Sequence, residues 1–203
     1  MAGPFADTFV EASDQLLELH TPTGPNAGSG WTRQGSDGQL IVRSSTGLVE
    51  DNDFLSSNQY RMNDNLGFDE MDVQADFTEL IGAGRCGVRV RLDPGDTTGW
   101  EFSYDANNSR WLITDGTSST TTAEAWPGGT VTIKAEMRTG VGRLYVNSVL
   151  KVTHSSNLLS GRTYAGIQVL NFDSTGPEHQ VDNYTSVGVG AVADPLIGAF
   201  MMS

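Results

Sequence analysis

The chain has 203 residues, a length that one β-rich domain can fill, because β sandwiches often run to about 200 residues as a single domain. It carries 25 acidic and 12 basic side chains and a net charge of −13, which argues against binding to nucleic acid or to an anionic membrane surface. Glycine accounts for 24 of the 203 residues, about 12% against the roughly 7% that is usual. Such a composition is typical of many short strands joined by tight turns.

The cysteine content and the start of the chain bear on its compartment. Cys86 is the only cysteine, so no internal disulfide can form and no cysteine cluster can hold zinc. The segment from Met1 to Asp7 lacks the basic and apolar regions of a secretory signal, and no stretch approaches the roughly 18 apolar residues of a membrane span. We therefore expect a protein without a signal peptide that is made in a cytoplasm and spans no membrane.

Taken in chain order, the apolar residues alternate with polar ones and almost nowhere recur at helical spacing. We therefore predict an all-β protein of about a dozen strands, which is more than one open sheet usually holds, so the strands should form a two-sheet sandwich. The predicted strands cover residues 16–20, 39–43, 58–62, 72–80, 87–92, 99–104, 110–114, 130–137, 143–147, 163–170 and 181–189.

Three stretches stand outside this pattern. Residues 21–30 form a loop by composition, and residues 117–122 are either a polar tip or a solvent-facing edge. Residues 191–203 are apolar without alternation, and we predict that they form a docking tail beyond a jelly-roll domain at 1–190. An apolar tail left in water would be adhesive, and the residues predicted to dock on a partner are Leu196, Ile197, Phe200, Met201 and Met202.

Several short segments occur in a recognisable order. They are Asp7-Thr-Phe, Gly30-Trp31-Thr, Gly129-Thr-Val-Thr-Ile-Lys-Ala-Glu, Arg143-Leu-Tyr-Val-Asn and Val181-Asp-Asn-Tyr. Their order resembles the concanavalin A-like, laminin-G-like jelly-roll superfamily, of the kind seen in bacteriophage structural proteins, over residues 7–189. The resemblance implies two antiparallel sheets whose concave face often binds sugars. One departure is Ser148, where glycine is usual at a hairpin, so that turn is expected to be longer or differently shaped.

Laminarinase-type hydrolases of this superfamily carry Glu-x-Asp-x-x-Glu or Glu-x-Asp-x-Glu on one strand, because a retaining mechanism needs two carboxyl groups about 5 Å apart. The nearest stretch here begins at Glu70 and Asp72, and Gln74 or Ala75 stands where the second glutamate should be. Asp76 shares a strand face with Glu70 but lies about 20 Å away, at roughly 3.3 Å per residue. We therefore predict that the protein is not an enzyme.

Metal sites receive little support from the sequence. His20, His154 and His179 are far apart and lack metal-ligand spacing, which favours surface or packing roles. Acidic and amide residues at 51–53, 93–96 and 105–108 offer oxygen ligands for calcium, but the same residues are the usual turn formers. We predict no cofactor, with a structural calcium ion as the alternative.

The aromatic residues divide into core and surface candidates. Trp100, Phe102 and Tyr104 share one face of a strand, and we predict that this face is core. Trp126 precedes Pro-Gly-Gly and is predicted to be the most exposed aromatic, so Trp126 and Trp31 are the candidates for stacking on a sugar. Cys86 is predicted to be a buried packing residue, as free cysteines usually are.

Two functions follow from these observations. The first is a non-enzymatic virion structural protein, a bacteriophage capsid decoration or cement protein or a tail-associated protein, located in the virion after assembly in the host cytoplasm. It would dock on neighbouring subunits, in a homo-oligomer or a shell, through its termini, as the apolar tail and the missing signal suggest. The alternative is a glycan-binding, lectin-like module for a cell-surface or secreted polysaccharide.

Overall fold

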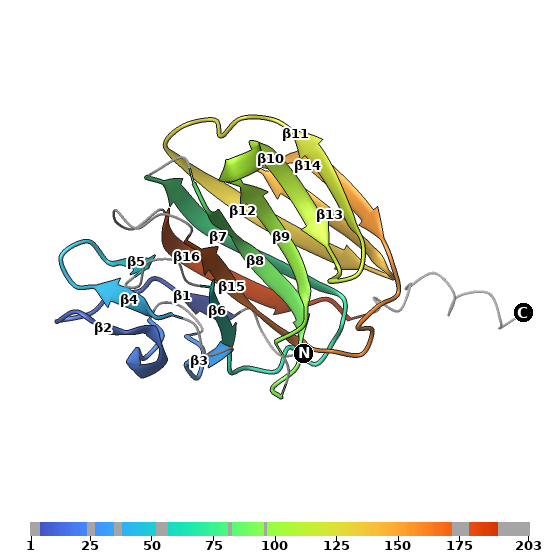
Figure 1. Cartoon of the computed structure of the whole chain (residues 1–203). Helices are drawn as coiled ribbons and strands as arrows, with labels where there is room; N and C mark the ends of the chain where they lie inside the picture. The colour runs from blue at the N-terminus through green and yellow to red at the C-terminus, as the bar shows by residue number, and fades with distance from the viewer. Residues whose placement is uncertain are drawn as a thin grey trace, which may run out of the picture.

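The predicted two-sheet antiparallel sandwich is confirmed. The computed structural model describes residues 5–23, 27–34, 38–51, 57–80, 83–95, 97–171 and 179–190. Within these residues, sixteen strands form a nine-stranded sheet and a seven-stranded sheet, and all pairings between strands are antiparallel. The two sheets lie face to face (Figure 1).

The nine-stranded sheet contains both the first and the last strand of the described chain. Its order is β14 (Val149–Ser155), β13 (Val141–Val146), β12 (Thr130–Arg138), β7 (Met71–Glu79), β16 (His179–Gly188), β5 (Leu48–Asp51), β4 (Leu40–Arg43) and β2 (Gln15–Leu16), and β1 (Phe5–Asp7) pairs with β16. Asp7 of β1 is paired with Tyr184 of β16, so the first and last described strands lie side by side.

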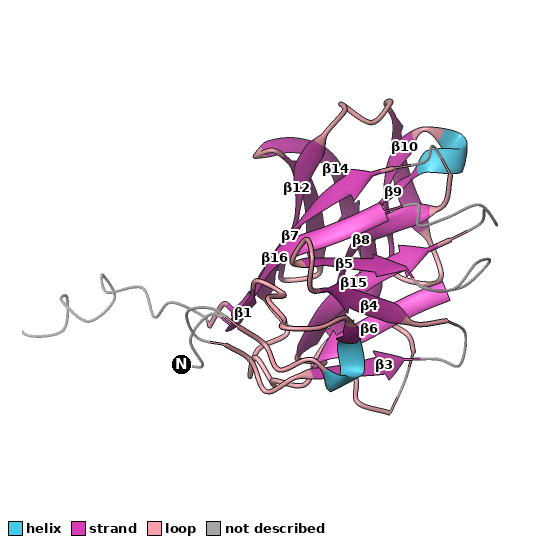
Figure 2. Cartoon of the chain, turned by 90° about the vertical axis from the view of Figure 1, so that its left-hand side faces the viewer, coloured by secondary structure: helices cyan, strands magenta, loops and turns pink. Residues whose placement is uncertain are grey.

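The seven-stranded sheet holds the middle of the chain. Its order is β11 (Ser119–Ala123), β10 (Arg110–Thr114), β9 (Trp100–Asp105), β8 (Arg85–Leu92), β15 (Tyr164–Leu170), β6 (Ser57–Met62) and β3 (Trp31–Gln34). Two short 3-10 helices, η1 (Leu17–Leu19) and η2 (Ala106–Asn108), lie at opposite ends of the sandwich (Figure 2). None of the described helices is long and apolar enough to cross a membrane.

Two local predictions differ from the structure. The strand predicted at 16–20 continues only to Leu16, and a 3-10 turn follows that buries Leu17 and turns His20 toward the buried carboxylate of Asp7. The hairpin at Ser148 is a two-residue turn rather than a longer one, because Asn147 and Ser148 both adopt the positive φ values, 48° and 67°, that such a turn requires. The polar segment at 117–122 contributes β11, an exposed edge strand, as one of its two interpretations predicted.

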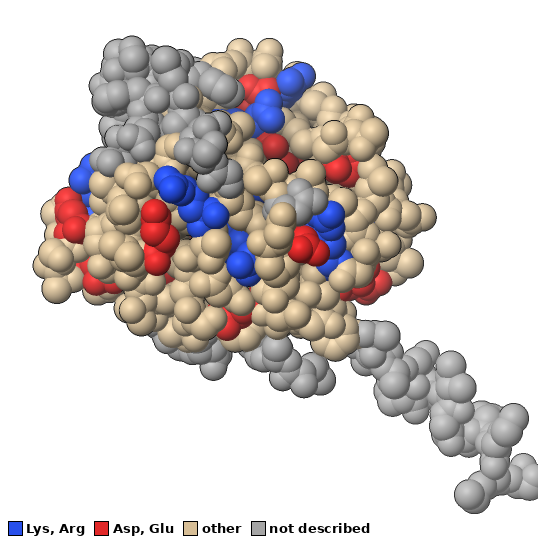
Figure 3. Space-filling model, turned by 60° about the horizontal axis from the view of Figure 1, so that its bottom comes forward, with Lys and Arg blue, Asp and Glu red and all other residues tan. Residues whose placement is uncertain are grey.

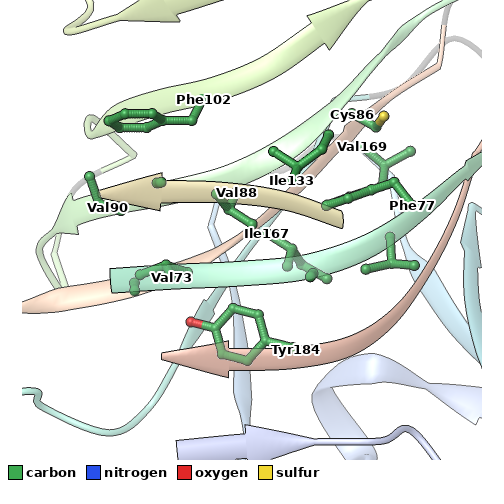
Figure 4. Packing of buried hydrophobic residues seen from close by; sticks show 14 of the residues in the cluster. Val73, Phe77, Cys86, Val88, Val90, Phe102, Ile133, Ile167, Val169 and Tyr184 are labelled. Carbon is green, nitrogen blue, oxygen red and sulfur yellow. The ribbon is translucent and has the colours of Figure 1, made fainter. Parts of the chain in front are cut away.

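The core lies between the sheets and is built from alternate residues of the long strands. Trp100, Phe102 and Tyr104 are buried in it, as predicted. Figure 4 shows side chains from both sheets meeting there, among them Val73 and Phe102. Cys86 is fully buried too, and burial raises the pKa of its thiol, so the prediction of a packing cysteine is confirmed.

The two sheets differ in how their outer faces meet solvent. Strands β7, β12 and β13 alternate between buried and partly exposed residues, so their outer face is open to water. Strands β8, β9 and β15 are buried at nearly every position, on both faces. The outer face of the seven-stranded sheet is therefore withdrawn from solvent although it points away from the core.

Candidate functional site

The outer face of the seven-stranded sheet is lined by polar side chains that strand register brings into rows. In one row Ser103 pairs with Gly87, Gly87 with Gln168 and Gln168 with Gln59. Residues paired across antiparallel strands project from the same face. With the two neighbouring rows they form what we call the polar face: Gln59, Arg61, Arg85, Gly87, Arg89, Glu101, Ser103, Asp105, Gly166 and Gln168.

Four of the five charged members of the polar face are removed from water, and the fifth, Arg85, is partly exposed. Arg61, Arg89, Glu101 and Asp105 are at most 8% exposed. Withdrawing an ion from water has an effective penalty of several kcal/mol unless partners compensate for it. A sandwich needs only one apolar face per sheet for its core, so the burial of ions on the second face points to a role other than holding the sheets together.

Two carboxylates on β9 share one arginine. Glu101 and Asp105 project from the same face, and the Nη1 and Nη2 atoms of Arg85 lie 3.3 Å from Glu101 Oε1 and 3.5 Å from Asp105 Oδ2. Arg110 Nη2 lies 3.0 Å from Asp105 Oδ2, and Ser103 donates a hydrogen bond to Glu101 at 2.5 Å. The arginines offset the repulsion between the two carboxylates and hold both in place.

The other side of the polar face is rich in donors. Arg89 donates to Gln59 Oε1 at 2.5 Å and to the carbonyl of Thr97 at 2.7 Å. Gln168 is 1% exposed, and its side-chain amide nitrogen has no hydrogen-bond partner in the structure. An unsatisfied buried donor typically costs about 1–3 kcal/mol. The polar face therefore combines fixed acceptors on β9 with at least one unused donor on β15.

Basic side chains are not spread evenly over this acidic protein. Figure 3 shows several of them in a broken row across the middle of one face of the molecule, with acidic side chains between and beside them. The net charge of −13 therefore does not describe every part of the surface.

The residues closest to the hydrolase motif lie on the other sheet. Asp72 is on the outer face of β7, where its carboxylate lies 2.6 Å from Arg138 and 3.1 Å from Lys134. Glu70 precedes the strand and accepts hydrogen bonds from the backbone and hydroxyl of Thr139. Gln74 borders a shallow hollow of about 260 Å³, lined by Gln74, Thr132, Lys134, Glu136, Tyr145 and Ser148. The stretch thus lies outside the polar face.

Sequence reasoning missed Glu101, Ser103 and Asp105. They alternate with Trp100, Phe102 and Tyr104, which were predicted as core, so the same alternation places them on the opposite face. Their spacing, Glu-x-Ser-x-Asp, puts two carboxylates on one strand face, which is the signal that could have found them.

The two candidate sugar-stacking tryptophans occupy different settings, and neither belongs to the polar face. Trp31 is 2% exposed and its indole N–H donates to Asp7 Oδ2 at 2.7 Å, so this ring is core and not a stacking surface. Trp126 is half-buried rather than freely exposed: its ring stacks on Trp111 at 5.7 Å and its indole N–H donates to the carbonyl of Gly129.

The histidines pack inside the domain. His20 contacts Asp7 and Glu11, His154 contacts Ser118 and Thr120, and His179 is fully buried, with a pKa lowered to about 4 by burial. In the described part of the chain no group of three or more histidine, cysteine or acidic side chains could hold a metal ion. Asp105, in one of the three predicted calcium loops, is instead bound by arginines.

The predicted docking tail, 191–203, lies outside the described residues. Its five candidate docking residues, Leu196, Ile197, Phe200, Met201 and Met202, and the virion role that they support therefore stay predictions.

No protein-family model and no curated protein matches the sequence. Among solved structures, a Bacillus licheniformis β-glucanase aligns with a TM-score of 0.61 at 10% identity, over 93% of this chain and 99% of that one. A Bacillus subtilis protein of unknown function with a galectin-like fold aligns with a TM-score of 0.60 at 10% identity, over 90% and 97%. The exoplasmic domain of VIP36, solved with Ca²⁺ and Man3GlcNAc, aligns with a TM-score of 0.52 at 13% identity, over 81% and 86%. The chain therefore has the concanavalin A-like jelly-roll fold, as its segment order predicted.

Proposed function

We propose that this protein is a glycan-binding module that holds its ligand on the polar face without cleaving it. The observation that carries the proposal is the row of planar polar side chains withdrawn from water around Gly87 and Gly166, with the amide nitrogen of Gln168 unpartnered. Of the two functions that the sequence suggested, the glycan-binding one gains support from the structure.

The chemistry of the polar face suits sugar hydroxyl groups. Each hydroxyl donates one hydrogen bond and accepts others, so it fits a surface that offers carboxylates and amides side by side. Glu101 and Asp105 supply acceptors, and Gln168 supplies a donor that gains a partner only when something binds. Ligand sites typically carry a few fixed polar groups of this kind.

The middle of the polar face is bare of side chains. A Cβ at Gly166 would lie 1.9 Å from the carbonyl oxygen of Tyr60, and one at Gly87 would lie 2.1 Å from that of Phe102. Neither position can carry a side chain without moving the neighbouring backbone. Both glycines are buried, and the missing side chains leave the backbone of the sheet as the only group there, so a flat ring that reaches this strip can lie close to it, as glycine allows where a ligand approaches a strand.

The shared fold is compatible with glycan binding but does not by itself establish it. The VIP36 domain, with the same fold, was solved with a mannose-containing glycan. The fold is equally that of a β-glucanase, so it does not decide between binding and cleavage. The distinction rests on the polar face, where Arg85 lies between Glu101 and Asp105 and binds both, an arrangement suited to holding acceptors still.

Two matched glutamine variants test the location of the site. Gln168→Ala removes a side chain from the polar face, and Gln74→Ala removes one from the hollow on the nine-stranded sheet. We expect the protein to bind members of a glycan array, Gln168→Ala to weaken that binding about tenfold, and Gln74→Ala to leave it unchanged.

Each other outcome has a clear meaning. If Gln74→Ala abolishes binding and Gln168→Ala does not, the site lies on the nine-stranded sheet and the assignment to the polar face is wrong. No binding across a broad array of neutral and acidic glycans refutes the proposed function. New reducing ends released from a bound oligosaccharide would show that the module is an enzyme.

A further inference from the structure

Arg61 is a buried cation that forms no ion pair with any carboxylate of the described residues. It is 7% exposed and projects from β6 onto the polar face, beside Gly166 of β15. Its Nη1 donates to the carbonyl of Met62 at 3.3 Å, and the ring of Tyr164 lies 4.6 Å from the guanidinium carbon. No carboxylate in the described chain forms an ion pair with it, although the negative charge of Asp93 is near enough to favour the protonated form of Arg61 and so to offset part of the lowering of its pKa by burial.

The free part of this guanidinium is the edge that binds oxyanions. Its Nε is buried and has no hydrogen-bond partner. The Nε and Nη atoms of arginine form a fork that matches the two oxygens of a carboxylate or a sulfate. Burial lowers the pKa of Arg61, yet an arginine stays protonated in proteins, so the charge persists although no described carboxylate is paired with it.

The neighbours of Arg61 on the polar face carry either no side chain or an unused donor. Gly166, its direct partner across β15, has no side chain, and Gln168, one step farther along the same face, holds the unpartnered amide nitrogen. On the other side Arg61 pairs with Thr32, the exposed residue of β3, which is the edge strand of the sheet. A ligand entering over Thr32 would reach Arg61 first and Gln168 next.

We infer that the polar face selects an acidic sugar, whose oxyanion binds the Nε edge of Arg61 while the adjoining ring hydroxyls bind Gln168. This inference rests on the proposed glycan-binding function and adds the class of ligand. A neutral sugar would satisfy Gln168 but would leave the guanidinium buried without a counter-charge, which is the costly arrangement. Uronic acids supply the oxyanion as a carboxylate, and sulfated sugars supply it as a sulfate.

The test compares ligands that differ only in their charge. Tetrasaccharides of galacturonate and of mannuronate are titrated into the full chain by calorimetry, alongside the same tetrasaccharides with each carboxylate reduced to an alcohol, and alongside a sulfated galactose tetrasaccharide. We expect at least one acidic ligand to bind about tenfold to a hundredfold more tightly than its neutral counterpart, the range for a charge-assisted, bidentate contact.

Three variants assign the preference to Arg61. Arg61→Gln should remove the preference for the acidic ligand, and Arg61→Lys should keep part of it because the charge remains. Arg143→Gln, which makes the same charge change on the outer face of the nine-stranded sheet, should have no effect. Circular dichroism confirms that each variant folds, and if Arg61→Gln does not, the Arg61→Lys comparison carries the test.

The outcomes separate this inference from the function on which it rests. Binding of neutral glycans at least as tight as binding of the acidic ones, or an acidic preference that survives Arg61→Gln, overturns the inference and leaves glycan binding intact. Failure to bind any glycan, acidic or neutral, overturns the proposed function itself. A preference confined to the sulfated ligand identifies sulfate rather than carboxylate as the oxyanion.

Discussion

The contacts of His20 predict a stability that falls as pH rises. The ring lies 2.8 Å from Asp7 through Nε2 and 2.5 Å from Glu11 through Nδ1, and both partners are carboxylate acceptors. Each ring nitrogen must therefore donate, which requires the imidazolium form. Burial alone would lower the pKa of His20, but the hydrogen bonds and charges of Asp7 and Glu11 outweigh it, so the pKa is raised.

The expected loss of unfolding free energy follows from the buried carboxylate of Asp7, which loses its partner when His20 is replaced. Asp7 is fully buried and also accepts hydrogen bonds from the backbone of Phe9 and Thr23 and from the indole of Trp31. Breaking a buried ion pair by removing one partner costs about 3–5 kcal/mol. For His20→Gln, whose amide can replace one donor, we expect a loss near the lower end, about 3 kcal/mol at pH 6. In a domain of this size that lowers Tm by roughly 6–12 °C.

The pH dependence has a definite sign. The pKa of His20 is higher in the folded protein than its unfolded value of about 6.5. Its contribution is therefore fully present below about pH 6.5 and is lost as pH rises through the raised, folded value. Urea unfolding followed by tryptophan fluorescence at pH 6, 7, 8 and 9 should show the gap between wild type and His20→Gln closing as pH rises.

A second histidine variant controls for burial. His179 has a pKa lowered to about 4 by burial, so it is neutral throughout the range from pH 6 to 9. In the unfolded chain it titrates near its usual pKa of about 6.5, so the stability that its neutral form contributes grows by under about 1 kcal/mol between pH 6 and pH 8. His179→Gln should therefore lower the stability by an amount that widens slightly as pH rises, the opposite of the gap for His20→Gln. A gap between wild type and His20→Gln that stays constant from pH 6 to 9 would refute the assignment of a charged imidazolium between Asp7 and Glu11.

Three further outcomes are expected. Trp126→Ala should lower the free energy of unfolding by about 2–3 kcal/mol, because its ring packs on Trp111 and Tyr104. Glycan binding should stay unchanged, and a loss of binding would show that Trp126 belongs to the glycan site. Ser148→Gly should raise that free energy by about 0.5–1 kcal/mol, since glycine relieves the positive φ of 67°; a lower Tm would contradict this. Deleting residues 191–203 should abolish oligomer assembly, measured by light scattering, without changing the circular dichroism of the sandwich; unchanged assembly would rule out a docking tail.

The long strands could be predicted because each contains its own evidence. Strands β7 and β12 have nine residues each, enough for several alternations of apolar and polar side chains. Strands β1 and β2 have three and two residues, too few for any period to show. They are fixed instead by partners elsewhere in the sequence, as β1 is by its pairing with β16. Alternation of apolar and polar residues therefore predicts the long strands of this sandwich but not the short ones, β1 and β2.

The candidate site was only half visible in the sequence. Alternation in β9 places Glu101, Ser103 and Asp105 on the face opposite the core aromatics, but an ordinary solvated face would show the same pattern. What distinguishes the polar face is that its rows run across β9, β8, β15 and β6, so that Ser103 comes to share a row with Gln168. Register between strands that are distant in sequence cannot be read from any one of them.

The net charge of −13 limits long-range partners more than it limits contact partners. At physiological salt the field of an exposed charge is screened within about 8 Å. A nucleic acid contacts a broad surface, so it comes within that distance of many acidic side chains and is repelled by them. A single acidic sugar on the polar face meets chiefly the groups within a few ångströms of it, and there Arg61 has no counter-ion in the described chain. The same protein can therefore repel a polyanionic surface and still bind one oxyanion, because burial near Arg61 strengthens the local charge while solvent weakens the distant ones.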